Sequence, residues 1–213
     1  TLARIGALCK QYDVIVVSDE IHCDLTKPGT EYIPFASVDD TCRDISVTCI
    51  APTKTFNLAG LQTAAVYAEN SILHHRMWRQ LNTDEVAEPN AFAIQATIAA
   101  FQYGEEWLDE LREYVEKNKQ YVTEFLQEKI PLIHPVAGDA TYLMWLDCRK
   151  ITESGRQFVK FIRKTSGLYV SGGNQYGRGG EGFLRVNVAT SKLVVEDGMQ
   201  RLYESVDAWL KEE

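Results

Sequence analysis

The sequence predicts an α/β fold, with part of a parallel α/β sheet in the first half and a smaller α+β unit in the second. Short apolar runs of strand length alternate with helical patterns along residues 1–103. A long amphipathic pattern at residues 105–130 then separates them from further strands and helices. We therefore expect the C-terminal portion of a large domain at residues 1–115 and a small C-terminal domain at residues 116–213.

The first half begins with a helical pattern in residues 1–11, where apolar side chains recur every three or four positions. Residues 14–17 read Val-Ile-Val-Val, and a run that is apolar at every position predicts a parallel strand buried on both faces. Further elements follow in order: strands at 45–50 and 63–68, then helices at 70–82 and 90–103.

The second half opens with the helix at residues 105–130, which Pro131 ends. A strand is predicted at 141–146, a helix at 155–166 and a strand at 183–188 after a Gly-rich loop. Apolar residues in a single stripe predict a last helix at 194–210.

Composition and spacing exclude several classes of function. Lys and Arg number 22 against 30 Asp and Glu, a net charge of −8, so neither nucleic acid nor an anionic membrane is an expected partner. No stretch is apolar enough to span a membrane. The five cysteines form no C-x-x-C pair and no zinc spacing is present, which favours reduced thiols in a cytosolic protein and no metal.

Two polar segments follow predicted strands, at the edge where open parallel sheets bind ligands. In residues 18–22, Asp19 and Glu20 either face a ligand or only cap a turn. In residues 51–57, Lys54 lies among small and apolar residues. There its pKa can fall and its amine can attack a carbonyl, whereas a lone loop lysine is ordinarily solvated.

A third candidate is Arg185, inside the predicted strand at 183–188. Strand alternation places it with Phe183 and Asn187, opposite the apolar face. A guanidinium suits bidentate recognition of a carboxylate, and a surface arginine on an edge strand is the alternative. Together, a lysine that forms a Schiff base with an aldehyde cofactor, an acid that keeps a pyridine nitrogen protonated and an arginine that holds a substrate carboxylate suggest one chemistry.

At these residues the sequence resembles the fold-type I pyridoxal-phosphate (PLP) enzymes, specifically the class I/II aminotransferase family. Three segments carry the resemblance, in matching order and spacing: SDEIHCDL at 18–25, APTKTFNLAGLQ at 51–62 and FLRVNVA at 183–189. The resemblance implies PLP as cofactor, with Asp19 at the pyridine nitrogen, His22 near the 3-oxygen, Lys54 as the cofactor lysine and catalytic base, and Arg185 at the substrate α-carboxylate.

Within the family, the sequence is most similar to the MalY/PatB-type cystathionine β-lyases, also described as cysteine-S-conjugate β-lyases. His22 stands where most aminotransferases have Tyr, and residues 28–37 resemble that branch's loop. Ala51 and Gln62 replace the Ser and Arg with which many aminotransferases bind the cofactor phosphate. The hydroxyl of Thr53 is a candidate phosphate contact.

The resemblance therefore implies a PLP-dependent carbon–sulfur β-lyase that acts on cystathionine or cysteine-type amino acids, and an aminotransferase is the alternative. Because family members are about twice as long, we expect this chain to be the C-terminal half of a cytoplasmic, homodimeric parent enzyme, with an incomplete active site of its own. A further alternative is an inactive truncated fragment or a regulatory binding protein.

Overall fold

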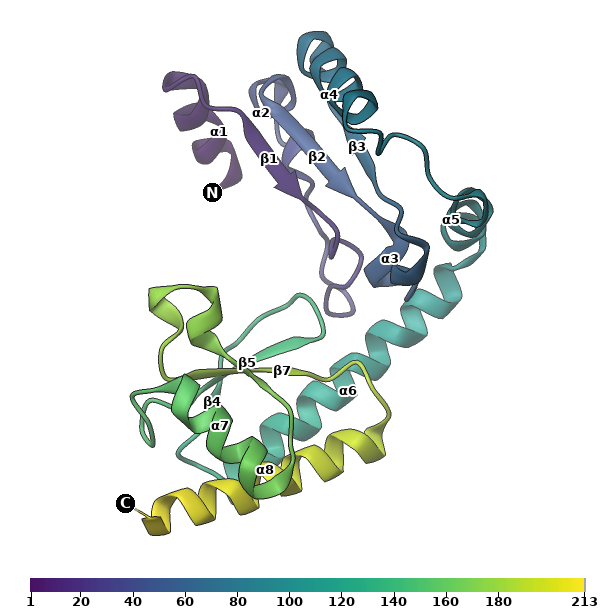
Figure 1. Cartoon of the computed structure of the whole chain (residues 1–213). Coiled ribbons are helices and arrows are strands. Elements are labelled where there is room, and N and C mark those ends of the chain that lie inside the picture. The colour runs from purple at the N-terminus through teal and green to yellow at the C-terminus, as the bar shows by residue number, and fades with distance from the viewer. Residues whose placement is uncertain (213) are drawn as a thin grey trace. The chain divides into compact units, whose positions relative to one another are not determined.

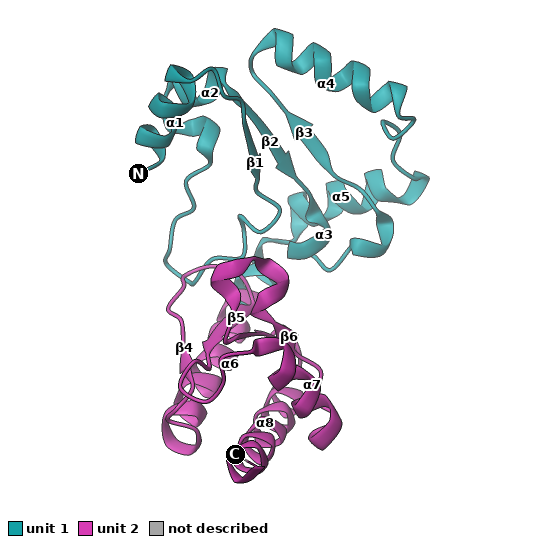
Figure 2. Ribbon diagram, turned by 60° about the vertical axis from the view of Figure 1, so that its left-hand side comes forward, with its two compact units in different colours: residues 1–110 teal, residues 111–213 magenta. Residues whose placement is uncertain are grey.

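The computed structural model describes residues 1–212 (Figure 1). The chain divides into two compact units, unit 1 at Thr1–Glu110 and unit 2 from Leu111 onward (Figure 2). The division falls within the long helix α6 (Glu105–Lys129). The domain boundary that we place at residue 115 falls within the same helix.

Unit 1 is a small sheet with short and long helices around it. Its elements in chain order are α1 (Leu2–Gln11), β1 (Val16–Asp19), η1 (Phe35–Ser37), α2 (Asp40–Asp44), β2 (Ser46–Ile50), α3 (Pro52–Thr55), η2 (Ala59–Leu61), β3 (Ala65–Tyr67), α4 (Ser71–Thr83) and α5 (Ala91–Tyr103). All three strands and the long helices α4 and α5 lie where the sequence predicts them. The short helices η1, α2, α3 and η2 are additions.

The sheet of unit 1 has the strand order β1-β2-β3. Strands β1 and β2 are parallel, with Asp19 opposite Cys49, and β3 is antiparallel to β2. The expected burial of residues 14–17 on both faces is wrong. Strand β1 begins only at Val16 and, among the described residues, pairs with β2 alone, so Val17 is 67% exposed.

Helix α1 is held against α2 by a close approach that requires a glycine. A Cβ built on Gly6 would lie only 2.3 Å from the Sγ of Cys42. Asp39 caps α2, because its Oδ1 accepts a hydrogen bond from the backbone N–H of Cys42 at 2.7 Å. The cap and the contact fix α2, which leads directly into β2.

Helix α5 is apolar on every side, unlike the amphipathic helices elsewhere in the chain. Asn90 caps it by accepting hydrogen bonds from two backbone N–H groups. Ala93 is its only buried residue, and Phe92 is 79% exposed. A helix with this composition is ordinarily covered on all sides, so α5 leaves unit 1 with a large apolar surface.

Unit 2 is an antiparallel sheet packed against long helices. After the C-terminal part of α6 come β4 (His134–Pro135), β5 (Leu143–Asp147), α7 (Gly155–Ser166), β6 (Ser171–Gly172), η3 (Gly173–Tyr176), η4 (Arg178–Gly180), β7 (Phe183–Asn187) and α8 (Lys192–Glu212). The strand order is β4-β5-β7-β6, and every neighbouring pair is antiparallel. The predicted helices and the strands β5 and β7 are confirmed, whereas β4 and β6 are additions.

The core of unit 2 lies between one face of this sheet and helices α6, α7 and α8. Alternate residues of β5 and β7 are buried in it, as strand periodicity requires. Fully buried side chains from the sheet and all three helices meet there, including Leu126, Leu146, Phe158, Leu184 and Leu202. Unit 2 therefore has one continuous hydrophobic core.

A buried polar side chain ties α6 to the end of β7. Asn118 is 2% exposed, and its Nδ2 donates hydrogen bonds to the carbonyl oxygens of Val188 at 2.9 Å and Thr190 at 3.0 Å. Nearby, the hydroxyl of Tyr114 accepts a hydrogen bond from the backbone N–H of Lys192. These bonds fix the segment between β7 and α8.

Over residues 1–212, no helix combines the length and the hydropathy that a bilayer crossing needs. The same residues contain no cluster of His, Cys, Asp and Glu that would hold a metal ion.

Candidate active site

The carboxyl end of β1 carries two acids with different surroundings. Glu20 is only 4% exposed, and its Oε1 accepts hydrogen bonds from the Ser18 hydroxyl at 2.9 Å and the Phe35 N–H at 3.1 Å. Asp19 is exposed, and its Oδ1 accepts one bond at 3.2 Å from the N–H of Ile21. Glu20 is thus used to hold η1, whereas Asp19 caps the following turn and still presents its carboxylate to solvent.

Lys54 lies on the short helix α3, for which the sequence pattern predicts no element. Pro52 occupies the first turn of α3, where its fixed φ suits a helix start. Pro52, Thr53 and Thr55 are buried, but Lys54 is exposed, so the apolar surroundings expected from its sequence neighbours do not enclose the amine.

A hydrogen bond joins α3 to the segment after β1. The hydroxyl of Thr55 donates to Oδ2 of Asp24 at 3.0 Å. Because β1 and β2 are parallel, both segments leave the sheet at the same edge. The bond therefore fixes the helix that carries Lys54 beside the turn that carries His22.

The pKa of His22 is affected by both Asp19 and Lys54, so the three side chains lie close together. Burial lowers the pKa of its imidazole, the positive charge of Lys54 lowers that pKa further, and the Asp19 carboxylate opposes both effects. The structure thus brings Asp19, His22 and Lys54 to one edge of the unit 1 sheet. The net lowering favours a neutral imidazole at neutral pH.

The positions around α3 differ from a typical phosphate-binding set. Thr53 is buried within α3, and Ala51 precedes the helix without a side chain that could cap it. Gln62 follows η2 in a left-handed conformation, with φ 50° and ψ 50°. Ala51 and Gln62 thus offer neither a hydroxyl nor a cation at the positions that the resemblance assigns to the phosphate.

Arg185 lies in unit 2, on the sheet face that points away from the core. Strand β7 pairs with β5 on one side and β6 on the other, so the alternative of an edge-strand arginine is wrong. The guanidinium lies 4.4 Å from the centroid of the Tyr176 ring, a cation–π contact. The strand neighbours of Arg185 are Trp145 and Ser171.

Two aromatic residues beside this arginine, Trp145 and Tyr176, are not evident from the sequence pattern. Trp145 and Tyr176 meet edge to face, with ring centroids 5.4 Å apart, and both line a cavity of about 330 Å³ with Phe183. The loop beside it needs a glycine, because a Cβ on Gly173 would lie 2.3 Å from the carbonyl oxygen of Gly180. The many glycines and aromatic residues before β7 are the sequence feature that points to this cavity. The pairing of β5 with β7 cannot be predicted from the sequence.

The chain combines an acid and a lysine at the ends of neighbouring parallel strands with an arginine inside an antiparallel sheet. Comparison with known proteins identifies the class to which this arrangement belongs. The chain belongs to the aminotransferase class I and II family, which it matches over residues 1–202. Its fold is that of the fold-type I transferases, as its similarity to solved members shows.

Particular relatives are lyases by name. The chain is 40% identical over 201 residues to cystathionine beta-lyase PatB of Bacillus subtilis, which covers 94% of this chain and 52% of PatB. It is 30% identical over 208 residues to protein MalY of Escherichia coli, covering 97% and 53%. The solved structure of cystalysin from Treponema denticola, which contains pyridoxal 5'-phosphate, matches with a TM-score of 0.93 at 28% identity, over 97% of this chain and 52% of cystalysin. The chain thus spans about half the length of the curated relatives it matches.

Proposed function

We propose that this chain is the C-terminal half of a PLP-dependent carbon–sulfur β-lyase that acts on cystathionine or cysteine-type amino acids. The observation that carries the proposal is the meeting of Asp19, His22 and Lys54 at one edge of the unit 1 sheet. The names of PatB and cystalysin's bound cofactor support the same reaction class and cofactor.

The three groups suit PLP by their chemistry. Asp19 has a carboxylate with capacity for a protonated ring nitrogen, because among the described residues a single backbone N–H donates to it. His22 is kept neutral and can hydrogen-bond an oxygen on the ring. Lys54 presents an exposed primary amine to the aldehyde. When bound, PLP supplies an aldehyde for the amine and a ring that withdraws electrons from the substrate Cα.

In the proposed reaction, Lys54 would hold the cofactor and would also act as general base toward the substrate. Its Nζ takes the proton from Cα, and the electron pair left there expels a thiolate from Cβ. Water then converts the three-carbon remainder to pyruvate and ammonia. Asp19 would keep the ring nitrogen protonated, and His22 would hydrogen-bond the 3-oxygen. Thr53 is proposed as a phosphate contact.

Arg185 is assigned to the substrate α-carboxylate. A guanidinium forms two parallel hydrogen bonds with a carboxylate, which fixes the orientation of Cα as well as its position. The Tyr176 ring restrains the guanidinium through the cation–π contact, so fewer rotamers must be frozen when the carboxylate binds. Tyr176 is therefore a positioning residue in this proposal.

We propose a cytoplasmic homodimer as the working form of the parent enzyme, with a small amino acid as its substrate. The five cysteines are all free in the described structure, which suits a reducing compartment. The exposed apolar surface of α5 supports a need for further protein contacts.

The test mixes the parent protein with PLP and cystathionine and omits any keto acid. We expect pyruvate and a thiol in equal amounts, and a loss of more than about a thousandfold for Lys54→Ala. Lys164→Ala, an exposed lysine on α7, is the control and should retain activity. Absence of pyruvate would rule out the lyase, and turnover that requires a keto acid would establish the aminotransferase.

The isolated chain is predicted to bind PLP weakly. Ala51 and Gln62 provide no hydroxyl and no cation for the phosphate, so Asp19, His22 and Lys54 would hold mainly the ring and the aldehyde. Titration of the chain with PLP, followed by absorbance, measures this affinity. A saturable new band at micromolar PLP, lost in Lys54→Ala, would contradict the prediction.

A further inference from the structure

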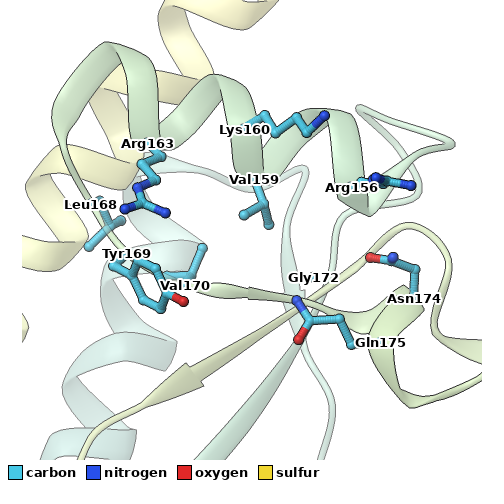
Figure 3. A pocket seen from close by; sticks show the side chains of 10 residues that line it. All are labelled: Arg156, Val159, Lys160, Arg163, Leu168, Tyr169, Val170, Gly172, Asn174 and Gln175. Carbon is cyan, nitrogen blue, oxygen red and sulfur yellow. The ribbon is translucent and has the colours of Figure 1, made fainter.

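Unit 2 contains a cavity of about 370 Å³ that involves none of the residues assigned above. One wall is helix α7, and the floor is the segment that leads from Leu168 into β6. Asn174 and Gln175 of η3 close one end. Figure 3 shows Arg156, Lys160 and Arg163 in a row along α7, above the strand segment with Val170 and Gly172.

The charge on this wall is all of one sign. Arg156, Lys160 and Arg163 are spaced four and three positions apart, which places them on the same face of α7. Within the described chain, no Asp or Glu lines the cavity. Three cations on one wall are notable in a chain whose net charge is −8.

The contrast with helix α8 shows that this arrangement is unusual within the molecule. On α8, the three cations Lys192, Arg201 and Lys211 each pair with a carboxylate four positions away on the same helix. Helix α7 contains no Asp or Glu, so Arg156, Lys160 and Arg163 have no such partner on it. Their charge is therefore available to a ligand.

The rest of the lining has the features of a binding site. The Arg163 guanidinium lies 5.0 Å from the centroid of the Tyr169 ring, which restrains it at the cavity wall. The Oδ1 atom of Asn174 is buried and has no hydrogen-bond partner among the described residues. That oxygen accepts hydrogen bonds and would not bind an anionic oxygen, whereas Nδ2 of the same amide is a donor that suits one. Val159, Leu168 and Val170 supply an apolar floor.

We propose that this cavity binds a small organic anion that carries at least two phosphate or carboxylate groups. From Arg156 to Arg163 the helix rises about 10 Å, at 1.5 Å per residue. A single inorganic phosphate is too small to contact both ends of that row, whereas two separated anionic groups are not. The apolar floor accommodates the body of the ligand, and Nδ2 of Asn174 donates a hydrogen bond to one of its anionic oxygens at the η3 end.

The test measures binding to the purified chain by isothermal titration calorimetry, with pyrophosphate and citrate as probes at low ionic strength. We expect saturable binding of at least one probe. Lys160→Gln and Arg163→Gln should each weaken it about tenfold, as expected for loss of a charge-assisted hydrogen bond. Lys164→Gln removes the same charge from the same helix outside the cavity, and its affinity should be unchanged.

Asn174→Asp provides a second, isosteric test. It places a negative charge at the η3 end of the cavity, so we expect binding to weaken by at least tenfold while the circular dichroism spectrum is retained. Preference for pyrophosphate assigns a phosphorylated ligand, and preference for citrate assigns a polycarboxylate. Binding of neither probe, or equal weakening by Lys164→Gln, would overturn the proposal. None of these readouts depends on PLP or Lys54.

Discussion

At the scale of single residues, Asp19 and Glu20 show how adjacent carboxylates acquire opposite tasks. Glu20 is buried and accepts two hydrogen bonds, one of them from the backbone of η1. Asp19, the last residue of β1, stays in contact with solvent. Because a buried carboxylate without hydrogen-bond partners costs folding free energy, Glu20 needs these two partners and has a structural role. Asp19 remains available for a ligand.

The pKa of His22 should respond in opposite directions to the loss of its two charged neighbours. Lys54→Met should raise it, because the Lys54 charge lowers it in the native chain. Asp19→Asn should lower it, because the carboxylate favours the imidazolium. NMR titration of the His22 ring protons measures both shifts. Shifts of the same sign, or none, would show that the three groups do not meet.

The same imidazole should make the stability of the chain depend on pH. The pKa of His22 is lowered on folding, so its contribution is complete above about pH 6.5, the ordinary histidine value, and is lost as pH falls through the lower native value. We expect His22→Gln to flatten the fall in urea midpoint below that pH, relative to the native chain. Parallel curves for the two proteins would contradict this expectation.

At the scale of elements, the long periodic segments are the ones that the sequence predicts well. Helix α6 and the alternation in β7 follow from repeating apolar positions, and the placement of Arg185 on the outer face of β7 follows with them. Helix α3 has only four residues and β6 only two, too few for any period to show. The burial of β1 was mispredicted because it depends on neighbouring strands, which a local pattern does not contain.

The candidate site likewise has a part that the sequence predicts and a part that it does not. The order of Asp19, His22 and Lys54 along parallel strand ends can be inferred from sequence, because such ends share an edge of the sheet. The contact between Tyr176 and Arg185 cannot, because it depends on the fold of the Gly-rich loop over β7. Burial of Glu20 likewise depends on η1, fifteen residues further along the chain.

Replacement of Asn118 by an apolar residue of similar size should lower the stability of unit 2. Asn118→Leu preserves the volume but leaves the carbonyl groups of Val188 and Thr190 without their amide donor. We expect a loss of about 1–3 kcal/mol in the free energy of unfolding. Urea unfolding followed by circular dichroism measures it, with Lys117→Gln as an exposed control on the same helix. A loss of unfolding free energy no larger than that of the control would show that the hydrogen bonds of Asn118 do not stabilise unit 2.

At the scale of the whole molecule, the two units differ in how well they bury their apolar residues. Unit 2 gathers side chains from α6 to α8 into one core. Unit 1 has a sheet of three strands, and Val14, Ile15 and Val17 are 49%, 49% and 67% exposed. Because burial of apolar area is the main stabilising contribution, the two units should differ in stability.

We therefore predict that unit 1 opens at lower urea than unit 2. Hydrogen exchange measured by mass spectrometry should show loss of protection in β1 and β3 while β5 and β7 remain protected. Asn118→Leu should bring forward the loss in unit 2 alone. A single concentration at which all strands lose protection together would contradict this order.

The unpaired edge of β1 has a consequence for this chain as an isolated protein. Among the described residues its outer N–H and C=O groups have no strand beside them, and Val17 lies exposed on the same strand. Such an edge is a template for another strand, so this half-length chain on its own should pair edge to edge with a second copy as its concentration rises.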